Sequence, residues 1–268
     1  MSSSDISPGQ AIPSTPEDVP GGQKSASSHI LGTGAGIIQS FKPINNFQQH
    51  VCTWAIFSHD MKRQIETHHY CSRLNEDFLQ CLVYDTDRAD GRLIGVEYII
   101  SERLFLGLPD EEKKLWHSHF YEIKNGLWVN PGVPEIVQKL ELKQLANTYG
   151  KFWCTWQFDR GDRLPLGPPA LMMSPQAQAP GQIRPELIKE RDEKYHISTS
   201  EKAESRKDIQ GPELIHPLSD LWKTTAKGWA VDLKEVDMIL RAGTPLADMD
   251  RNTNVATTED SKGDESRL

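Results

Sequence analysis

The sequence predicts an α+β fold, mostly antiparallel sheet with a few packed helices, flanked by disordered N- and C-terminal tails. Short β-prone segments between turn-rich clusters predict the sheet, and one longer segment with helical periodicity predicts a packed helix. Both ends are polar and poor in aromatic residues, so they cannot bury enough apolar surface to offset the entropy of ordering. The 268 residues are 37% hydrophobic and 25% charged, which is ordinary for a soluble core diluted by polar tails.

These patterns divide the chain into four parts. We expect a disordered segment at residues 1–40, an α+β core domain at 41–178, a charged and amphipathic helical extension at 179–247 and a disordered tail at 248–268. Residues 32–36 spell a GxGxG fragment, but no strand signal precedes them. We therefore interpret them as a flexible joint and not as a dinucleotide-binding fingerprint.

The core contains several segments with the alternation or composition of strands. Residues 65–72 alternate so that His69 shares one face with Thr67, while His68 and Tyr70 share the other. Further strands are expected at residues 78–84, 93–100, 116–124 and 151–158.

Two glycine-containing signals predict where the neighbouring elements turn or end. Asn125-Gly126 favours a type I′ hairpin turn, so residues 127–129 are expected to return beside the preceding strand. Residues 134–149 have helical periodicity, with Gly150 as the expected stop signal. The buried side of this helix is expected to carry Ile136, Val137, Leu140 and Leu145.

Charge and cysteine usage narrow the function classes. A net charge of −8 argues against a nucleic-acid binder that works by neutralising phosphates. No apolar run reaches the roughly 18–20 residues of a transmembrane helix, and the N-terminus does not resemble a secretory signal. We therefore expect a cytoplasmic protein, and the sequence leaves open whether it forms a homo-oligomer. Its cysteines are expected to be reduced and mostly buried: Cys52, Cys71, Cys81 and Cys154.

The histidines are the best candidates for chemistry. His117 and His119 are two residues apart on a predicted strand and so share a face. His69 and Glu97, on predicted neighbouring strands, are the best further ligands. Imidazole with carboxylate suits a Zn, Mn or Fe centre, so the sequence suggests a metal site made by these four residues.

A buried hydrogen-bond network, or an acid–base site without metal, would use the same residues. A second layer around the cluster is expected from His68, Tyr70 and Glu122. Of these, Glu122 falls on the opposite face of the predicted strand from His117 and His119.

Residues 212–246 suggest amphipathic helices that could lie on a lipid surface. Trp222 and Trp229 stand near lysines, which is an interfacial pattern. The alternative interpretation is that both tryptophans pack on the core.

Three strings in the core resemble the oil body-associated protein family over about residues 42–178. They are ETHHYCSRLNEDFLQCLVYD, RLIGVEYIISERLFLGLPDEEKKLWHSHFYEIKNG and YGKFWCTWQFDRGDRLPLGPPALM. The resemblance implies association with lipid droplets and a role in keeping their size and integrity. It supplies no catalytic activity and no cofactor and leaves the molecular mechanism open, so the sequence favours a protein that is not an enzyme without deciding the question. The alternative is a metal-dependent enzyme or small-ligand binder that uses the histidine cluster.

Overall fold

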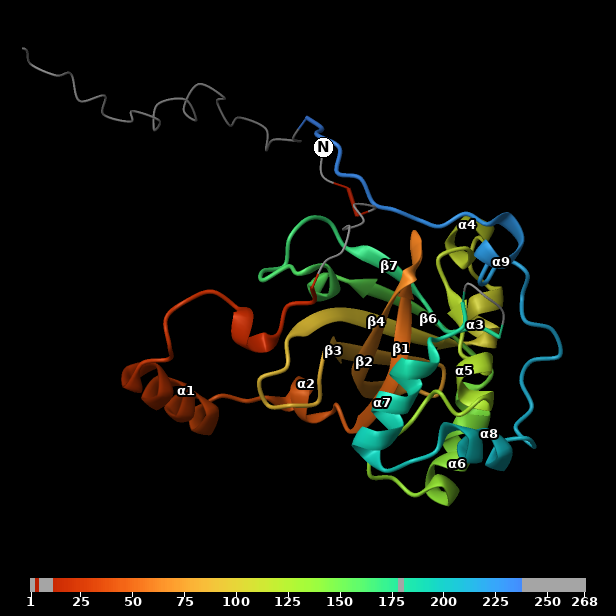
Figure 1. Cartoon of the computed structure of the whole chain (residues 1–268), viewed down its shortest axis with the longest axis horizontal. Helices are drawn as coiled ribbons and strands as arrows, with labels where there is room; N and C mark the ends of the chain where they lie inside the picture. The colour runs from red at the N-terminus through yellow and green to blue at the C-terminus, as the bar shows by residue number, and fades with distance from the viewer. Residues whose placement is uncertain (1–2, 5–11, 178–180, 238–268) are drawn as a thin grey trace, which may run out of the picture. The chain divides into compact units, whose positions relative to one another are not determined.

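The centre of this computed structural model is an antiparallel sheet of seven strands in the order β4-β3-β2-β1-β7-β6-β5. The structure describes residues 3–4, 12–177 and 181–237. The strands are β1 (Gln49–Phe57), β2 (Asp60–Asn75), β3 (Phe78–Tyr84), β4 (Leu93–Ser101), β5 (His117–Ser118), β6 (Thr148–Cys154) and β7 (Ala170–Met173). Because β4 also pairs with β6 from Gly95 to Ser101, the sheet closes into a barrel (Figure 1).

The predicted fold class is confirmed, and the central strands lie close to their predicted positions. Strand β3 matches its predicted range, β2 contains residues 65–72, and β4 extends the prediction by Ser101. Strand β6 ends earlier than predicted, at Cys154, and Phe158–Arg160 form a 3-10 helix instead. The inward side chains of the strands form an apolar core around Phe57 and Phe152.

Mostly short helices connect and cover the strands. They are α1 (Ala26–Ile38), α2 (Lys42–Asn45), α3 (Glu102–Leu106), α4 (Asp110–Lys113), α5 (Phe120–Lys124), α6 (Glu135–Leu145), α7 (Pro185–Tyr195), α8 (Thr199–Ser205) and α9 (Trp222–Thr225). Helix α7 lies over β1, where the Arg191 guanidinium stacks 4.4 Å from the Trp54 ring centroid.

The predicted hairpin around Asn125-Gly126 is wrong. His117 and Ser118 form a two-residue strand, and the chain then turns into α5. Residues 127–129 do not return as a strand; the amides of Leu127 and Trp128 instead donate to the carbonyl of Glu122. The Asn-Gly pair therefore ends a helix, with Gly126 at φ +74°, which is another common use of a glycine with positive φ.

The predicted helix is present as α6, but only Leu145 of the four residues predicted on its buried side is buried. The helix buries Gln138, Leu142 and Leu145 and ends at Leu145, whereas Gly150, the expected stop signal, belongs to β6. Three of the residues expected in the core are exposed, with exposed fractions of 84% for Ile136, 63% for Val137 and 77% for Leu140.

The flanking regions carry some local helix where the structure describes them. Residues 12–40, expected to be disordered, include a 3-10 helix at Pro16–Asp18 and helix α1, which contains the glycines of the GxGxG fragment. In the expected amphipathic stretch at 212–246, the described residues carry only the four-residue helix α9. Residues 238–246, like the tail at 248–268, lie outside the described residues.

The cysteines differ from the expectation of reduced thiols. Cys71 and Cys81 stand directly opposite each other on β2 and β3 and form a disulfide. Cys52 and Cys154 are buried thiols, and burial raises the pKa of Cys154 to about 12. The sequence does not show strand register, so it could not reveal this pairing.

All of the named elements belong to one compact unit, Met1–Leu233. Of a second unit, Lys234–Leu268, the structure describes only residues 234–237.

Candidate functional site

A cluster of ionisable side chains lies inside the barrel, among otherwise apolar neighbours. Glu97 projects from β4, His69 from β2, and His117 and His119 from β5 and the start of α5. All four side chains are buried. The structure therefore brings together the four residues that the sequence proposed as metal ligands.

The carboxylate of Glu97 is the common partner of the three histidines. Its Oε2 accepts a hydrogen bond from Nδ1 of His69 at 2.8 Å. Its Oε1 lies 3.0 Å from Nε2 of His117 and 3.5 Å from Nε2 of His119. One carboxylate oxygen thus faces two imidazoles, and the other oxygen faces the third.

These contacts set the charge of the carboxyl group. Burial alone would raise the pKa of Glu97, but the charge of His69 and the hydrogen bond of His117 hold it well below its usual range. Burial lowers the pKa of His119. Burial is also the largest single effect on His117, but the hydrogen bond to Glu97 and the charges of nearby carboxylates together outweigh it and raise the pKa of His117. The centre is therefore an anionic carboxylate surrounded by imidazoles.

The outer nitrogens of two histidines are held by threonines. The Thr148 hydroxyl donates to the carbonyl of Leu145 at 2.6 Å, so it can only accept from Nδ1 of His119, at 2.9 Å. Nε2 of His119 therefore carries a lone pair toward the cluster. His69 is engaged at both nitrogens, by Glu97 and by the Thr67 hydroxyl at 2.9 Å.

Glu122 joins this cluster, contrary to the expected strand geometry. Because the chain turns into α5 at His119, Glu122 lies one helical turn further on, and its Oε1 is 4.0 Å from Nε2 of His119. Its Oε2 accepts a hydrogen bond from Thr53 at 2.5 Å. Burial raises the pKa of Glu122 to about 8.

The space at the centre is kept open by a glycine. A Cβ atom on Gly150 of β6 would lie 2.3 Å from Oε1 of Glu97, 2.5 Å from Nε2 of His119 and 2.6 Å from Nε2 of His117. A cavity of about 10 Å³ adjoins the cluster, lined by side chains that include Glu97, His117 and Glu122. That volume is close to the minimum for one water molecule, so the site suits a very small occupant.

His68 and Tyr70, expected in a second layer, lie on the other face of β2. Nε2 of His68 contacts Oε1 of Glu66 at 3.0 Å, and its Nδ1 contacts His50, whose ring stacks on Tyr70. They form a separate cluster on the far side of the sheet and do not support the barrel site.

Trp222 and Trp229, the two residues expected to contact lipid, lie in different environments. Trp222 is 9% exposed and packs with Leu171 and Met173 in the core, whereas Trp229 is 38% exposed. A further exposed apolar surface is on α1, which has no buried residue. Ile30 and Leu31 are each 73% exposed, and Ile37 and Ile38 are 81% and 86% exposed.

Sequence reasoning missed this surface because it treated the N-terminal segment as unstructured. The available signal was the spacing of the apolar residues in HILGTGAGII. Ile30 and Ile37 are seven positions apart, as are Leu31 and Ile38, and residues seven positions apart lie on the same side of a helix.

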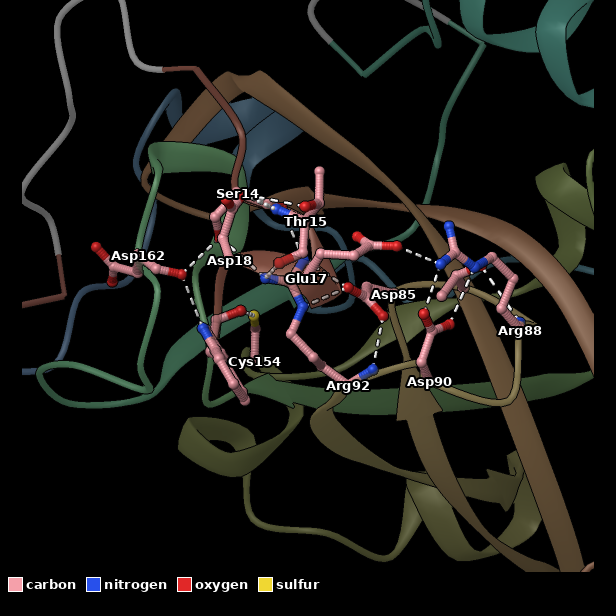
Figure 2. Close-up of polar contacts among 12 residues, drawn as sticks. Ser14, Thr15, Glu17, Asp18, Asp85, Arg88, Asp90, Arg92, Cys154 and Asp162 are labelled. Carbon is pink, nitrogen blue, oxygen red and sulfur yellow. Dashed lines mark hydrogen bonds and ion pairs between the residues drawn. The ribbon is translucent and has the colours of Figure 1, made fainter. Parts of the chain in front are cut away.

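The chain before α1 is attached to the barrel by a buried arginine. Figure 2 shows Arg92 beside Asp85, with its guanidinium against the backbone of Ser14 and Thr15. Arg92 Nη2 donates to the Ser14 carbonyl at 2.7 Å and lies 2.6 Å from Oδ2 of Asp85. The amide of Ser14 also donates to the carbonyl of Phe158 at 2.9 Å.

Among the described residues, none of the helices has the length and apolar character needed to cross a membrane.

Fold and site together define an antiparallel barrel protein that encloses a carboxylate–histidine cluster and carries an exposed apolar helix. No solved structure matches it. The model of the family described as "Protein of unknown function (DUF1264)" matches residues 41–210. With its curated relatives, this match shows that the chain belongs to the oil body-associated protein family.

The relatives cover most of both chains. The chain is 53% identical to oil body-associated protein 2A of Zea mays over 227 residues, which is 84% of this chain and 90% of that protein. It is 50% identical to protein 2B of Zea mays over 252 residues, covering 91% of this chain and all of that protein. It is 52% identical to protein 2A of Arabidopsis thaliana, covering 89% of this chain and 97% of that protein.

Proposed function

We propose that this protein associates with the surface of lipid storage bodies and docks there through helix α1. The relatives are named as oil body-associated, which supplies the kind of surface. The observation that carries the proposal is the exposure of every large apolar side chain of α1.

The composition of α1 suits a lipid monolayer better than a charged partner. The helix contains no Asp, Glu, Lys or Arg, and its other side is made of small residues such as Gly32, Thr33 and Gly36. A helix of this kind binds by inserting apolar side chains between lipids, because it has little charge with which to attract a headgroup. Each isoleucine or leucine contributes about 1.5–3 kcal/mol when fully buried, less the cost of association.

The flanking attachments allow α1 to act as an anchor for the barrel. On one side, Ser14 and Thr15 are held by Arg92, and on the other side the chain enters the sheet at Gln49. A helix attached at both ends transmits its docking to the whole domain.

Helix α6 offers a second exposed apolar surface that fits lipid less well. Its exposed Ile136 and Leu140 stand among charged residues, including Lys139 and Lys143, which pair with Asp208 at 2.6 and 3.3 Å. Helix α6 also buries part of its surface in the core, so it contributes to the folded protein whether or not lipid is present. It is therefore a matched control for α1.

The proposal is tested by flotation of the full chain with triacylglycerol droplets coated with phosphatidylcholine. We expect the natural protein to float with the droplets, with little dependence on salt because α1 is uncharged. A variant with serine at Ile30, Leu31, Ile37 and Ile38 is expected to stay in solution. The control variant, with serine at Ile136, Val137 and Leu140, is expected to float.

Two results would overturn the proposal: no flotation of the natural protein, or undiminished flotation of the α1 variant. Loss of flotation in the α6 control alone would move the docking surface to α6.

We further propose that docked protein slows coalescence by covering the lipid surface, which helps maintain droplet size. Droplet diameter followed over time, with and without protein, measures that effect.

A further inference from the structure

We propose that Glu97, His117 and His119 bind one divalent transition-metal ion inside the barrel. This inference does not rest on the proposed lipid association, and it assigns a site to side chains that lipid docking does not use.

The first support is the convergence of ligand atoms. One carboxylate oxygen of Glu97 and one ring nitrogen of each histidine all lie within 4.8 Å of one another. Metal–ligand bonds of about 2.0–2.2 Å join ligand atoms at separations of this order. The three atoms surround the space over Gly150, where a Cβ would stand 2.3–2.6 Å from each of them.

The second support is that both histidines face the centre with a ring nitrogen that can act as a ligand. The Thr148 hydroxyl fixes the proton of His119 on Nδ1, which leaves Nε2 available as a ligand. His117 also faces the centre with Nε2, and its buried Nδ1 has no hydrogen-bond partner among the described residues.

The remaining acidic and basic groups fit supporting roles. His69 uses both ring nitrogens for Glu97 and Thr67, so we assign it as a positioning residue and not as a ligand. Glu122 places a second carboxyl group beside His119. The carboxylate of Glu97 would offset part of the charge of a divalent ion in a buried site, where unbalanced charge is expensive.

Two other groups of metal-binding residues in the described chain are less suitable. The group of Cys52, Glu66 and His68 has the ammonium of Lys194 only 3.5 Å from the Glu66 carboxylate. The group of His69, Cys81 and Glu97 includes a sulfur that is already bonded in a disulfide.

The ligand set favours Zn²⁺, Fe²⁺ or Mn²⁺, because imidazole and carboxylate together suit these ions. The test uses the full chain purified without a histidine tag. We expect about one such ion per chain by elemental analysis, or uptake of about one equivalent of added Zn²⁺ after chelation. Added Co²⁺ is expected to give visible absorption bands that report nitrogen and oxygen ligands.

Variants separate this site from surface histidines. His119→Gln removes a ligand, and Gly150→Ala fills the space between the ligands. Both are expected to lose the Co²⁺ bands and the rise in Tm with Zn²⁺. His68→Gln changes an equally buried histidine on the other face of β2, and Gly107→Ala adds a Cβ whose nearest contact is at 3.4 Å. Both controls are expected to bind as the natural protein does.

Natural protein that holds no metal and binds neither Zn²⁺ nor Co²⁺ while folded would falsify the proposal. Binding that survives in His119→Gln and Gly150→Ala would assign the ion to another place. Circular dichroism of each variant distinguishes loss of the site from loss of the fold. Droplet flotation is scored separately, so failure of either proposal leaves the other standing.

Discussion

The barrel interior and helix α1 reverse the usual distribution of side chains. The interior buries Glu97 with three histidines, whereas α1 exposes Ile30, Leu31, Ile37 and Ile38. A buried charge persists only when partners surround it, and an exposed apolar patch commonly marks a contact with another surface. The polar groups of the barrel interior thus find partners within the chain or need only a small ion, whereas the apolar side chains of α1 are left exposed for the proposed contact with another surface.

Substitution of Glu97 by alanine is expected to have the largest effect on stability. It removes the common partner of the buried histidines and leaves their polar nitrogens without it. We expect a loss of about 3–5 kcal/mol in the free energy of unfolding, as for other broken buried ion pairs. Urea denaturation measures this loss.

The matched control is Glu141→Ala, which breaks a partly exposed pair with Arg73. Its expected loss is within about 1 kcal/mol. Equal losses at the two positions would contradict the view that the interior is a mutually dependent cluster.

Metal removal is expected to have the next largest effect and depends on the proposed ion. An ion that binds only the folded chain adds about 2.7 kcal/mol at a concentration a hundred times its Kd. Chelation should therefore lower Tm, and addition of Zn²⁺ should restore it. A Tm that is the same with and without chelator would indicate that the histidine cluster is complete without metal.

Ser14→Ala tests the connection between the two regions. The change removes a hydroxyl that accepts from Arg92 at 2.9 Å and donates to the Asp162 carbonyl at 2.7 Å. We expect a loss of about 1 kcal/mol and faster hydrogen exchange of the amides at residues 14–19. Ser27→Ala, at an exposed position of α1, is the control and should change neither measurement.

The smallest effect on stability is expected for serine at Ile30 and Ile37. Both side chains are exposed in the folded chain, so the free energy of unfolding should stay within about 0.5 kcal/mol of the natural value. By contrast, alanine at the buried Ile99 should lower it by about 2–5 kcal/mol. A large loss from the α1 substitutions would show that this helix packs within the protein.

The sequence predicts the strands whose residues alternate. It is less informative where tertiary packing decides the type of an element or which side of it is buried. Strand β3 was predictable because both neighbours of this strand impose the same period. Residues 116–124 were assigned to one strand, but Phe120 and Ile123 pack in the core from the same side of α5. The buried side of α6 was also decided by packing, which selects Leu142 over Leu140 although the two residues are chemically identical.

The residues of the candidate site were predictable from their chemistry, but their roles were not. Histidine spacing and predicted strands suggested His69, Glu97, His117 and His119, which meet inside the barrel. The distinction between a ligand and a positioning histidine depends on the threonine contacts, which no sequence pattern indicates. The role of Gly150 depends in the same way on strand register, which was visible only in the fold.

Closure of the barrel has a consequence for crowding. In the described sheet, β4 and β6 complete a ring in which β1, β2, β3 and β7 also have a partner on each side. Proteins gathered on a common surface meet at high local concentration, and unpaired strand edges would then join chain to chain. A ring without long open edges lets many copies stand side by side without seeding aggregates.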